Sequence, residues 1–215
     1  MKKTLLTGLV VGTMMFGMLG VANATIITYD QLEGGSGDVL NVLFNGIDDI
    51  NFGTTVTGHL MQTGDLVNFM GNEMLFTTAI GQARIEAVDG EFTWLKIWLD
   101  DPTKGFEKIQ FNLDFANNGE VSFSILDQYG TAFDSTWDVN GNGQNWFTAI
   151  GLDGQVMTSI TIQSTGATIS GINDIQQIRI GPADIPNNVP EPATMFLFGT
   201  GLAGLAGLRF RNKKS

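Results

Sequence analysis

The chain has 215 residues, of which 22 are acidic and 11 basic, and it has no cysteine. The lack of cysteine excludes disulfide bonds, thiolate metal sites, a cysteine nucleophile and a cysteine-linked lipid anchor, so a packed core must hold the fold together. Residues 25–189 contain 21 acidic and five basic side chains, a net charge of −16. Such a surface repels nucleic acid and anionic lipid, and we expect no nucleic-acid partner.

The first 24 residues have the pattern of a secretory signal peptide. Two lysines precede an apolar stretch from residue 5 to residue 21. Ala22 and Ala24 follow, where signal peptidase requires small side chains. We therefore predict cleavage before Thr25, with signal peptidase and the Sec export machinery as partners. A retained N-terminal membrane helix is the alternative.

Residues 25–183 predict an all-β domain, because short apolar runs alternate with polar residues and no amphipathic helix intervenes. Residues 109–115 and 121–125 around Asn117-Asn118-Gly119 predict one hairpin, and 84–88 and 91–99 around Asp89-Gly90 predict a second. Further strands are expected at 40–44, 54–60, 66–69, 74–78, 159–163 and 175–180. About nine to eleven short strands predict an antiparallel β-sandwich of the jelly-roll type.

His59 is the only histidine, so a Ser-His-Asp triad would have to use it. Alternation over residues 54–60 places Val56 and Leu60 on one face of a strand and His59 on the solvent-facing side. No nucleophile-elbow motif accompanies it. Pairs of carboxylates suffice for a glycosidase but are uninformative in so acidic a chain. The sequence thus offers no catalytic residue, and we expect a non-enzymatic protein.

A strand at residues 92–99 carries two of the four tryptophans. Alternation places Trp94 and Trp98 on the face opposite the apolar residues, with Lys96 between them. Aromatic faces beside polar groups can stack on sugar rings, which makes the pair a candidate ligand site. The alternative is a central strand with both faces covered, since tryptophan is highly buried on average.

Oxygen-bearing side chains at Asp138, Asn140 and Asn142 match the first half of a calcium-binding loop, with a glycine at the sixth position. Ala149 stands at the twelfth position, where such a loop needs a bidentate glutamate. An Asn-Gly-rich β-turn explains the same residues. Calcium is the only cofactor that the sequence suggests.

The C-terminal segment predicts a single transmembrane helix at residues 193–208. A linker at 184–189 leads to Pro190-Glu191-Pro192, and an uncharged apolar run follows at 193–208. As a helix this run covers roughly 24 Å, short of the roughly 30 Å hydrocarbon core, so it spans only with the help of flanking residues. The basic residues that would fix its end in the cytoplasm are Arg209, Arg211, Lys213 and Lys214.

The two prolines hold Pro190-Glu191-Pro192 as an extended peptide just outside the membrane, where a processing enzyme can read it. Together with the Gly-containing apolar run and the basic end, residues 190–215 resemble the PEP-CTERM sorting signal of Gram-negative bacteria, which is also catalogued as an ice-binding-protein C-terminal domain. The resemblance implies an exosortase as partner, an inner-membrane intermediate, and export to the cell surface or a polysaccharide-rich extracellular matrix. An ordinary tail anchor is the alternative.

A second resemblance concerns the domain itself. Residues 105–111, 142–147 and 174–181 are similar to galactose-binding-like β-sandwich ectodomains that precede this sorting signal. The resemblance implies architecture and no activity. Two function classes follow: a non-enzymatic surface or matrix protein that associates with exopolysaccharide, and an exported carbohydrate-active enzyme, a glycoside hydrolase or lyase, on a jelly roll.

Overall fold

The computed structural model describes residues 25–34, 36–78, 84–141, 143–165 and 171–186. The chain divides into two compact units, residues 1–184 and 185–215, and the described residues belong to the first unit except for 185 and 186. The predicted signal peptide with Ala22 and Ala24, Asn142 of the calcium hypothesis, the sorting motif, the segment 193–208 and the terminal basic residues all lie outside the described residues.

The described part is built almost entirely of strands. These are β1 (Thr25–Tyr29), β2 (Leu40–Leu43), β3 (Phe52–Leu60), β4 (Leu66–Thr78), β5 (Arg84–Ala87), β6 (Trp94–Leu99), β7 (Lys104–Phe115), β8 (Gly119–Asp127), β9 (Ala132–Val139), β10 (Asn145–Leu152), β11 (Met157–Thr165) and β12 (Ile172–Asp184). The one helical element there is a short 3-10 turn at Ser36–Asp38. Within the described ranges, no helix is long and apolar enough to cross a membrane.

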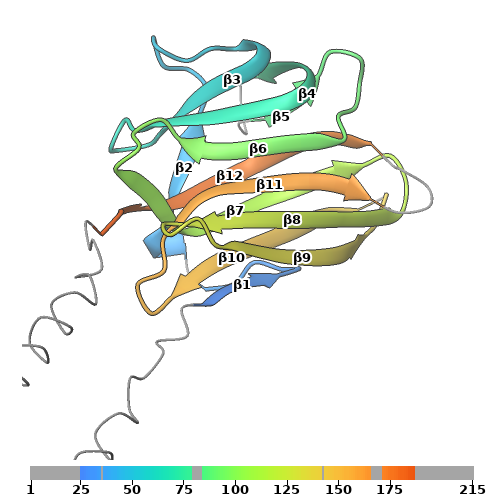
Figure 1. The fold of residues 1–215 in the computed structure, drawn as a ribbon. Helices are drawn as coiled ribbons and strands as arrows, with labels where there is room; N and C mark the ends of the chain where they lie inside the picture. Colours follow the sequence, from blue (N-terminus) through green and yellow to red (C-terminus); the bar gives the residue numbers. More distant parts are fainter. Residues whose placement is uncertain (1–24, 35, 79–83, 142, 166–170, 187–215) are drawn as a thin grey trace, which may run out of the picture. The chain divides into compact units, whose positions relative to one another are not determined.

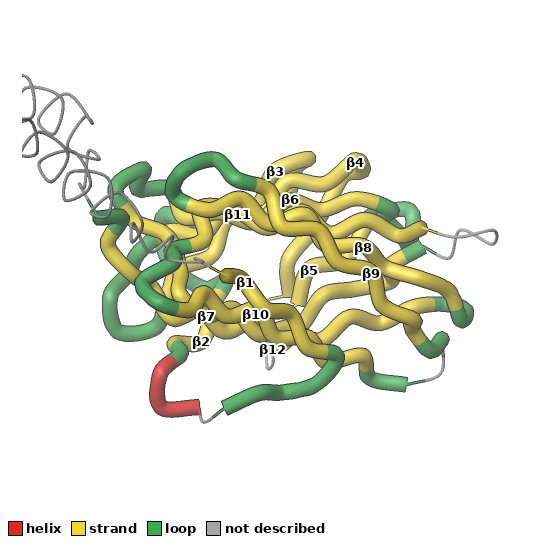
Figure 2. The backbone as a smooth tube through the Cα atoms, turned by 60° about the horizontal axis from the view of Figure 1, so that its bottom comes forward, coloured by secondary structure: helices red, strands yellow, loops and turns green. Residues whose placement is uncertain are grey.

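The strands form two packed antiparallel layers, as Figures 1 and 2 show. One layer has the order β1-β10-β7-β12-β2 and the other β3-β4-β6-β11-β8-β9, while β2–β3 pairing and strand β5 join the two layers at one edge. Eight strands in the orders β2-β12-β7-β10 and β6-β11-β8-β9 reproduce the two four-stranded sheets of a jelly roll. The predicted all-β jelly-roll sandwich is therefore confirmed.

Both predicted hairpins are wrong, although their strands exist. β7 pairs with β10, β12 and β11, while β8 pairs with β11 and β9; β5 pairs with β12 and β4, and β6 with β4 and β11. Alternation reports only which face of a strand is buried. The Asn117-Asn118-Gly119 turn carries the chain from one layer to the other, so that β7 and β8 bury their apolar faces against the same core from opposite sides. The Asp89-Gly90 turn leads from β5, which pairs with a strand of each layer, to β6.

The core between the layers is apolar and rich in phenylalanine. Phe111 of β7, Phe147 of β10 and Phe123 of β8 are in mutual ring contact, with centroids 4.8–6.0 Å apart. Because β8 belongs to the opposite layer, this cluster ties the two layers together. Within the described part of the chain, the strand pairings and core residues belong to residues 25–184, which form one continuous hydrophobic core.

The described chain enters and leaves the sandwich at the same end. Asp184 pairs with Lys104 at the start of β7. Thr25 pairs with Leu152 of β10, two residues beyond the pair Ile150 and Lys108. The opposite end of β7, near Asp114, therefore lies away from the point at which the chain continues toward the sorting motif.

Candidate functional site

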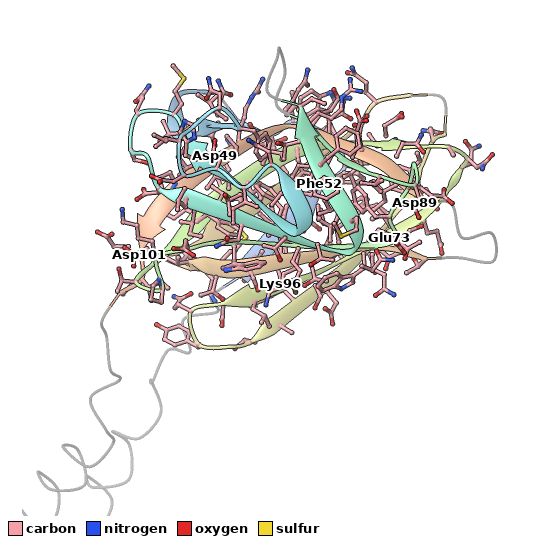
Figure 3. The ribbon with its side chains drawn as sticks, turned by 90° about the horizontal axis from the view of Figure 1, so that it is seen from above. Asp49, Phe52, Glu73, Asp89, Lys96 and Asp101 are labelled. Carbon is pink, nitrogen blue, oxygen red and sulfur yellow. The ribbon has the colours of Figure 1, made fainter. Side chains whose placement is uncertain are left out.

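Strand β6 presents Trp94, Lys96 and Trp98 on the outside of the sandwich. Its other face is core, because Leu95 and Ile97 are fully buried. The three outward side chains are each partly exposed, and Lys96 is labelled in Figure 3. The alternation of the sequence thus placed both tryptophans on the correct face, although their role in binding stays a prediction.

The neighbouring strands contribute one methionine and two polar residues to this surface. Lys96 is opposite Met70 of β4 and Thr161 of β11, and Gln163 of β11 is opposite Trp94. The ammonium nitrogen of Lys96 lies 5.6 Å from the centre of the Trp98 ring. We call the three β6 residues together with Met70, Thr161 and Gln163 the tryptophan face.

One asparagine fixes the position of Trp94. The side-chain oxygen of Asn72 accepts hydrogen bonds from the backbone N–H groups of Thr93 and Trp94, at 3.1 and 2.9 Å. The backbone before the first tryptophan is therefore held to β4. Such a fixed aromatic surface loses little conformational entropy when a ligand binds.

His59 lies on the outward face of β3, as alternation predicted, but its ring is hydrogen-bonded to a buried carboxylate. Its Nδ1 is 3.0 Å from Oδ2 of Asp49, which also accepts the backbone N–H of Gly46 at 2.6 Å. The pair fastens the loop before β3 to the strand. Within the described ranges, no serine or threonine hydroxyl is hydrogen-bonded to His59.

The predicted calcium loop forms the β9–β10 turn. Asn145 organises this turn, since its amide donates to the carbonyl oxygens of Asn140 and Gly143 and its oxygen accepts the N–H of Asn140. Asp138 and Asn140 are exposed. Among the described residues, no group of three or more His, Asp or Glu side chains could hold a metal, and the calcium hypothesis stays a prediction.

The outside of the other layer holds a polar cluster that sequence reasoning missed. Across four strands, Trp146 of β10 lies opposite Asn112 of β7, then Gln176 of β12, then Arg84 of β5. In the next row, Asp114 lies opposite Asp174, which lies opposite Glu86. Alternation in residues 109–115 already predicted that Asn112 and Asp114 lie on the outside. The residues of neighbouring strands that complete the cluster could not be predicted from this one strand.

The partners that are present satisfy only part of this cluster. Arg84 is 3.0 Å from Glu86 and 3.5 Å from Oδ2 of Asp174, and Asn173 donates to Asp114 at 3.0 Å. Among the described residues, Asn112, 1% exposed, has no hydrogen-bond partner for either its amide nitrogen or its oxygen, and Asp174, 6% exposed, has none for Oδ1. We call Asn112, Asp174, Gln176, Arg84, Trp146 and Arg179 the Asn112 face.

Burial also shifts an ionisation within the Asn112 face. Removal from water raises the pKa of Asp174 to about 6, and the negative charges of Asp114 and Glu86 act in the same direction. The positive charge of Arg84 opposes them. Asp174 is therefore an acceptor at neutral pH and a donor below about pH 6.

The remaining two tryptophans have different environments. Trp137 packs against the core, and its Nε1–H donates to Oγ1 of Thr28 at 3.3 Å. Trp146 lies outside, with the Arg179 guanidinium carbon 5.7 Å from its ring centre. Of the two, only Trp146 belongs to an outer surface.

Comparison with known proteins identified the tail and found remote fold similarities. One similar solved structure is a variant of a family 29 carbohydrate-binding module with cellulohexaose; it is 11% identical, the match covers 73% of this chain and 90% of that chain, and the TM-score is 0.35. Another is an exo-beta-agarase; it is 13% identical, the match covers 69% of this chain and 25% of that chain, and the TM-score is 0.38. At these identities and TM-scores neither similarity identifies a ligand. The search of curated proteins found no match.

The tail gives a specific result. The PEP-CTERM protein-sorting motif matches residues 188–212, which include the predicted Pro190-Glu191-Pro192, the whole apolar run at 193–208 and the basic residues Arg209 and Arg211. The predicted sorting signal is confirmed. The chain therefore carries a PEP-CTERM sorting motif and is an exported protein that an exosortase sorts to the cell envelope or surface.

Proposed function

We propose that the domain is a non-enzymatic component of the cell surface or extracellular matrix of a Gram-negative bacterium, and that it binds exopolysaccharide through the tryptophan face. The observation that carries the proposal is the position of Trp94 and Trp98 on one outer face, on either side of Lys96. Signal peptidase, the Sec machinery and a membrane-bound intermediate complete the proposed route of export.

The chemistry of this surface suits a carbohydrate chain. Indole faces pack against the C–H groups of sugar rings, while Lys96, Thr161 and Gln163 offer donors and acceptors to hydroxyl groups. Trp94 and Trp98 are four residues apart, about 13 Å along a strand. That separation exceeds one sugar ring, so we expect a polymer to bind better than a monosaccharide.

Each contact between a tryptophan and a sugar ring is weak, so retention of the protein on the polysaccharide would depend on many copies of the domain binding one polymer. Aromatic contacts of this kind contribute about 0.5 to 1.5 kcal/mol each beyond the area they bury. Many copies on one polymer raise the overall affinity without new contacts. Because the domain is strongly acidic, an anionic polysaccharide should bind poorly at low salt, whereas a neutral one should be insensitive to salt.

Affinity electrophoresis tests the proposal. The residue 25–186 domain is run through gels with and without the exopolysaccharide of the source strain, beside Trp94→Ala and Trp98→Ala. Tyr129→Ala is the matched control, because Tyr129 is an exposed aromatic residue (60%) in the β8–β9 turn and is not part of the tryptophan face. We expect retardation of the wild type and of the control, and loss of retardation in both tryptophan variants.

Two results would count against the proposal. Equal mobility of all the proteins with and without polysaccharide would leave a surface component that does not bind this glycan. Breakdown of the polysaccharide within the gel would favour the alternative function, a carbohydrate-active enzyme.

A further inference from the structure

The Asn112 face combines deep burial with hydrogen-bonding groups that have no partner in the part of the chain that the structure describes. The side chain of Asn112 points away from the core, since its neighbours Phe111 and Leu113 are core residues. A buried amide without partners lowers the stability of the folded state, because it has lost its hydrogen bonds to water and gained none in return. A protein retains such a group at a cost to its stability, and a bound ligand that meets it removes that cost.

Arg179 accounts for part of the burial. It lies opposite Gln110 on one side of β7, and Trp146 lies opposite Asn112 on the other side. Their contact at 5.7 Å therefore passes over the outward side chains of β7. Within the described ranges Arg179 forms no ion pair or side-chain hydrogen bond, so its five N–H donors are available to a ligand.

The unused groups define the ligand's chemistry. Asn112 offers two N–H donors and an oxygen acceptor, and Oδ1 of Asp174 offers a further acceptor. The two residues are diagonal neighbours on adjacent strands, about 7 to 8 Å apart at Cα. A sugar ring matches this set, because each hydroxyl both donates and accepts and neighbouring hydroxyls can meet an amide together. Trp146 supplies an aromatic surface at the edge.

Charged ligands fit less well. An anion would be repelled by Asp114, Asp174 and Glu86, which outnumber the two arginines. A cation would meet the guanidinium groups of Arg84 and Arg179 and the amide donors of Asn112. The opposing charges therefore favour an uncharged molecule.

We infer that the Asn112 face is a second binding site, one that takes a single uncharged pyranose residue between Asn112, Asp174 and Arg179. It lies in the opposite layer from the tryptophan face and does not depend on it. Asn112 is eight residues from Lys104 along β7, about 27 Å from the end at which the chain leaves the sandwich. The site is thus at the far end of the domain from the linker.

The test uses methyl glycosides of glucose, galactose and mannose with the residue 25–186 domain. Tryptophan fluorescence and melting temperature are followed as each sugar is added. We expect a saturable response to at least one of the three. Asn112→Leu, which keeps the size of the side chain and removes its polar atoms, should weaken binding at least tenfold while its melting temperature stays equal to or above that of the wild type.

Two further variants separate this site from the proposed function. Arg179→Met should weaken sugar binding about tenfold, whereas the double variant Trp94→Ala, Trp98→Ala should bind the monosaccharide as the wild type does while losing retention in polysaccharide gels. No saturable response to any of the three sugars, binding by Asn112→Leu at wild-type affinity, or preference for methyl glucuronide, the charged analogue, would each overturn the inference.

Discussion

Arg179 and Trp146 stand on two strands that are not neighbours, yet the guanidinium carbon lies 5.7 Å from the centre of the indole ring. The contact crosses the central strand β7 on the outside of the sandwich. The tryptophan face has one such contact of its own, because Nζ of Lys96 lies 5.6 Å from the centre of the Trp98 ring. The indole of Trp146 is already in contact with a cation, whereas Trp94 has no ring contact with a cation among the described residues.

The first prediction concerns the pH dependence of stability. The pKa of the Asp174 carboxyl group is about 6 in the folded domain, against an ordinary value of 3.8. The folded state therefore binds the proton of this carboxyl group more tightly than the unfolded state does. The buried carboxylate of Asp174 therefore does not lower the free energy of unfolding below about pH 4, where the group is protonated. The loss of stability grows as the pH rises through the window from 3.8 to about 6. Asp174→Asn should match the wild type in urea unfolding at pH 4 and be more stable at pH 7.5, by at most about 3 kcal/mol.

The opposite trend would contradict this assignment. A variant that loses stability at pH 7.5 would mean that the ion pair with Arg84, at 3.5 Å, outweighs the cost of burying the charge. An equal difference at both pH values would mean that the substitution acts through packing.

The second prediction concerns the two glycines of the Asn-Gly loop, Gly141 and Gly143. A Cβ atom at Gly141 would overlap the backbone of Asn117, whereas one at Gly143 would meet its nearest neighbour, Cβ of Asn140, at 4.0 Å. Gly141→Ala should therefore destabilise the domain by about 1 to 3 kcal/mol, and Gly143→Ala by no more than about 0.5 kcal/mol. Thermal unfolding measures both. Equal effects would show that close packing of the two turns is not the reason for Gly141.

The third prediction follows from the calcium hypothesis for Asp138, Asn140 and Asn142. A site of this kind in an extracellular module has a dissociation constant of about 0.1 to 1 mM. Calcium at ten times that value would stabilise the fold by about 1.4 kcal/mol, a few degrees in melting temperature. Superimposable melting curves in millimolar calcium and in chelator would remove the hypothesis and leave a turn organised by Asn145.

What the sequence predicts well is the direction of each side chain. Alternation put Trp94 and Trp98 outside and Leu95 inside without any knowledge of the neighbouring strands. Alternation could not show which strands pair with each other, because the same pattern suits a hairpin and a connection between the two layers. The prediction that β7 pairs with β8 was therefore wrong. The Asn112 face brings together residues 84, 112, 146 and 174 from four strands, and only the topology creates it.

The fourth prediction concerns the sorting motif. Replacing Pro190-Glu191-Pro192 by three alanines should remove the extended peptide that an exosortase reads, so the full-length chain should accumulate unprocessed and fail to reach the surface. Immunoblotting of membrane and surface fractions measures this. Processing equal to that of the parent would mean that these three residues are not needed for recognition and that the segment 193–208 acts as an ordinary tail anchor.

The central claim is that the tryptophan face binds exopolysaccharide. The four tryptophans give four indole N–H signals in a ¹⁵N-correlation spectrum, and single Trp→Phe variants assign them. On addition of the exopolysaccharide of the source strain, the signals of Trp94 and Trp98 should shift or broaden, while that of Trp137, which packs against the core and donates to Thr28, should stay in place. Unchanged signals from Trp94 and Trp98 at saturating polysaccharide would contradict the claim.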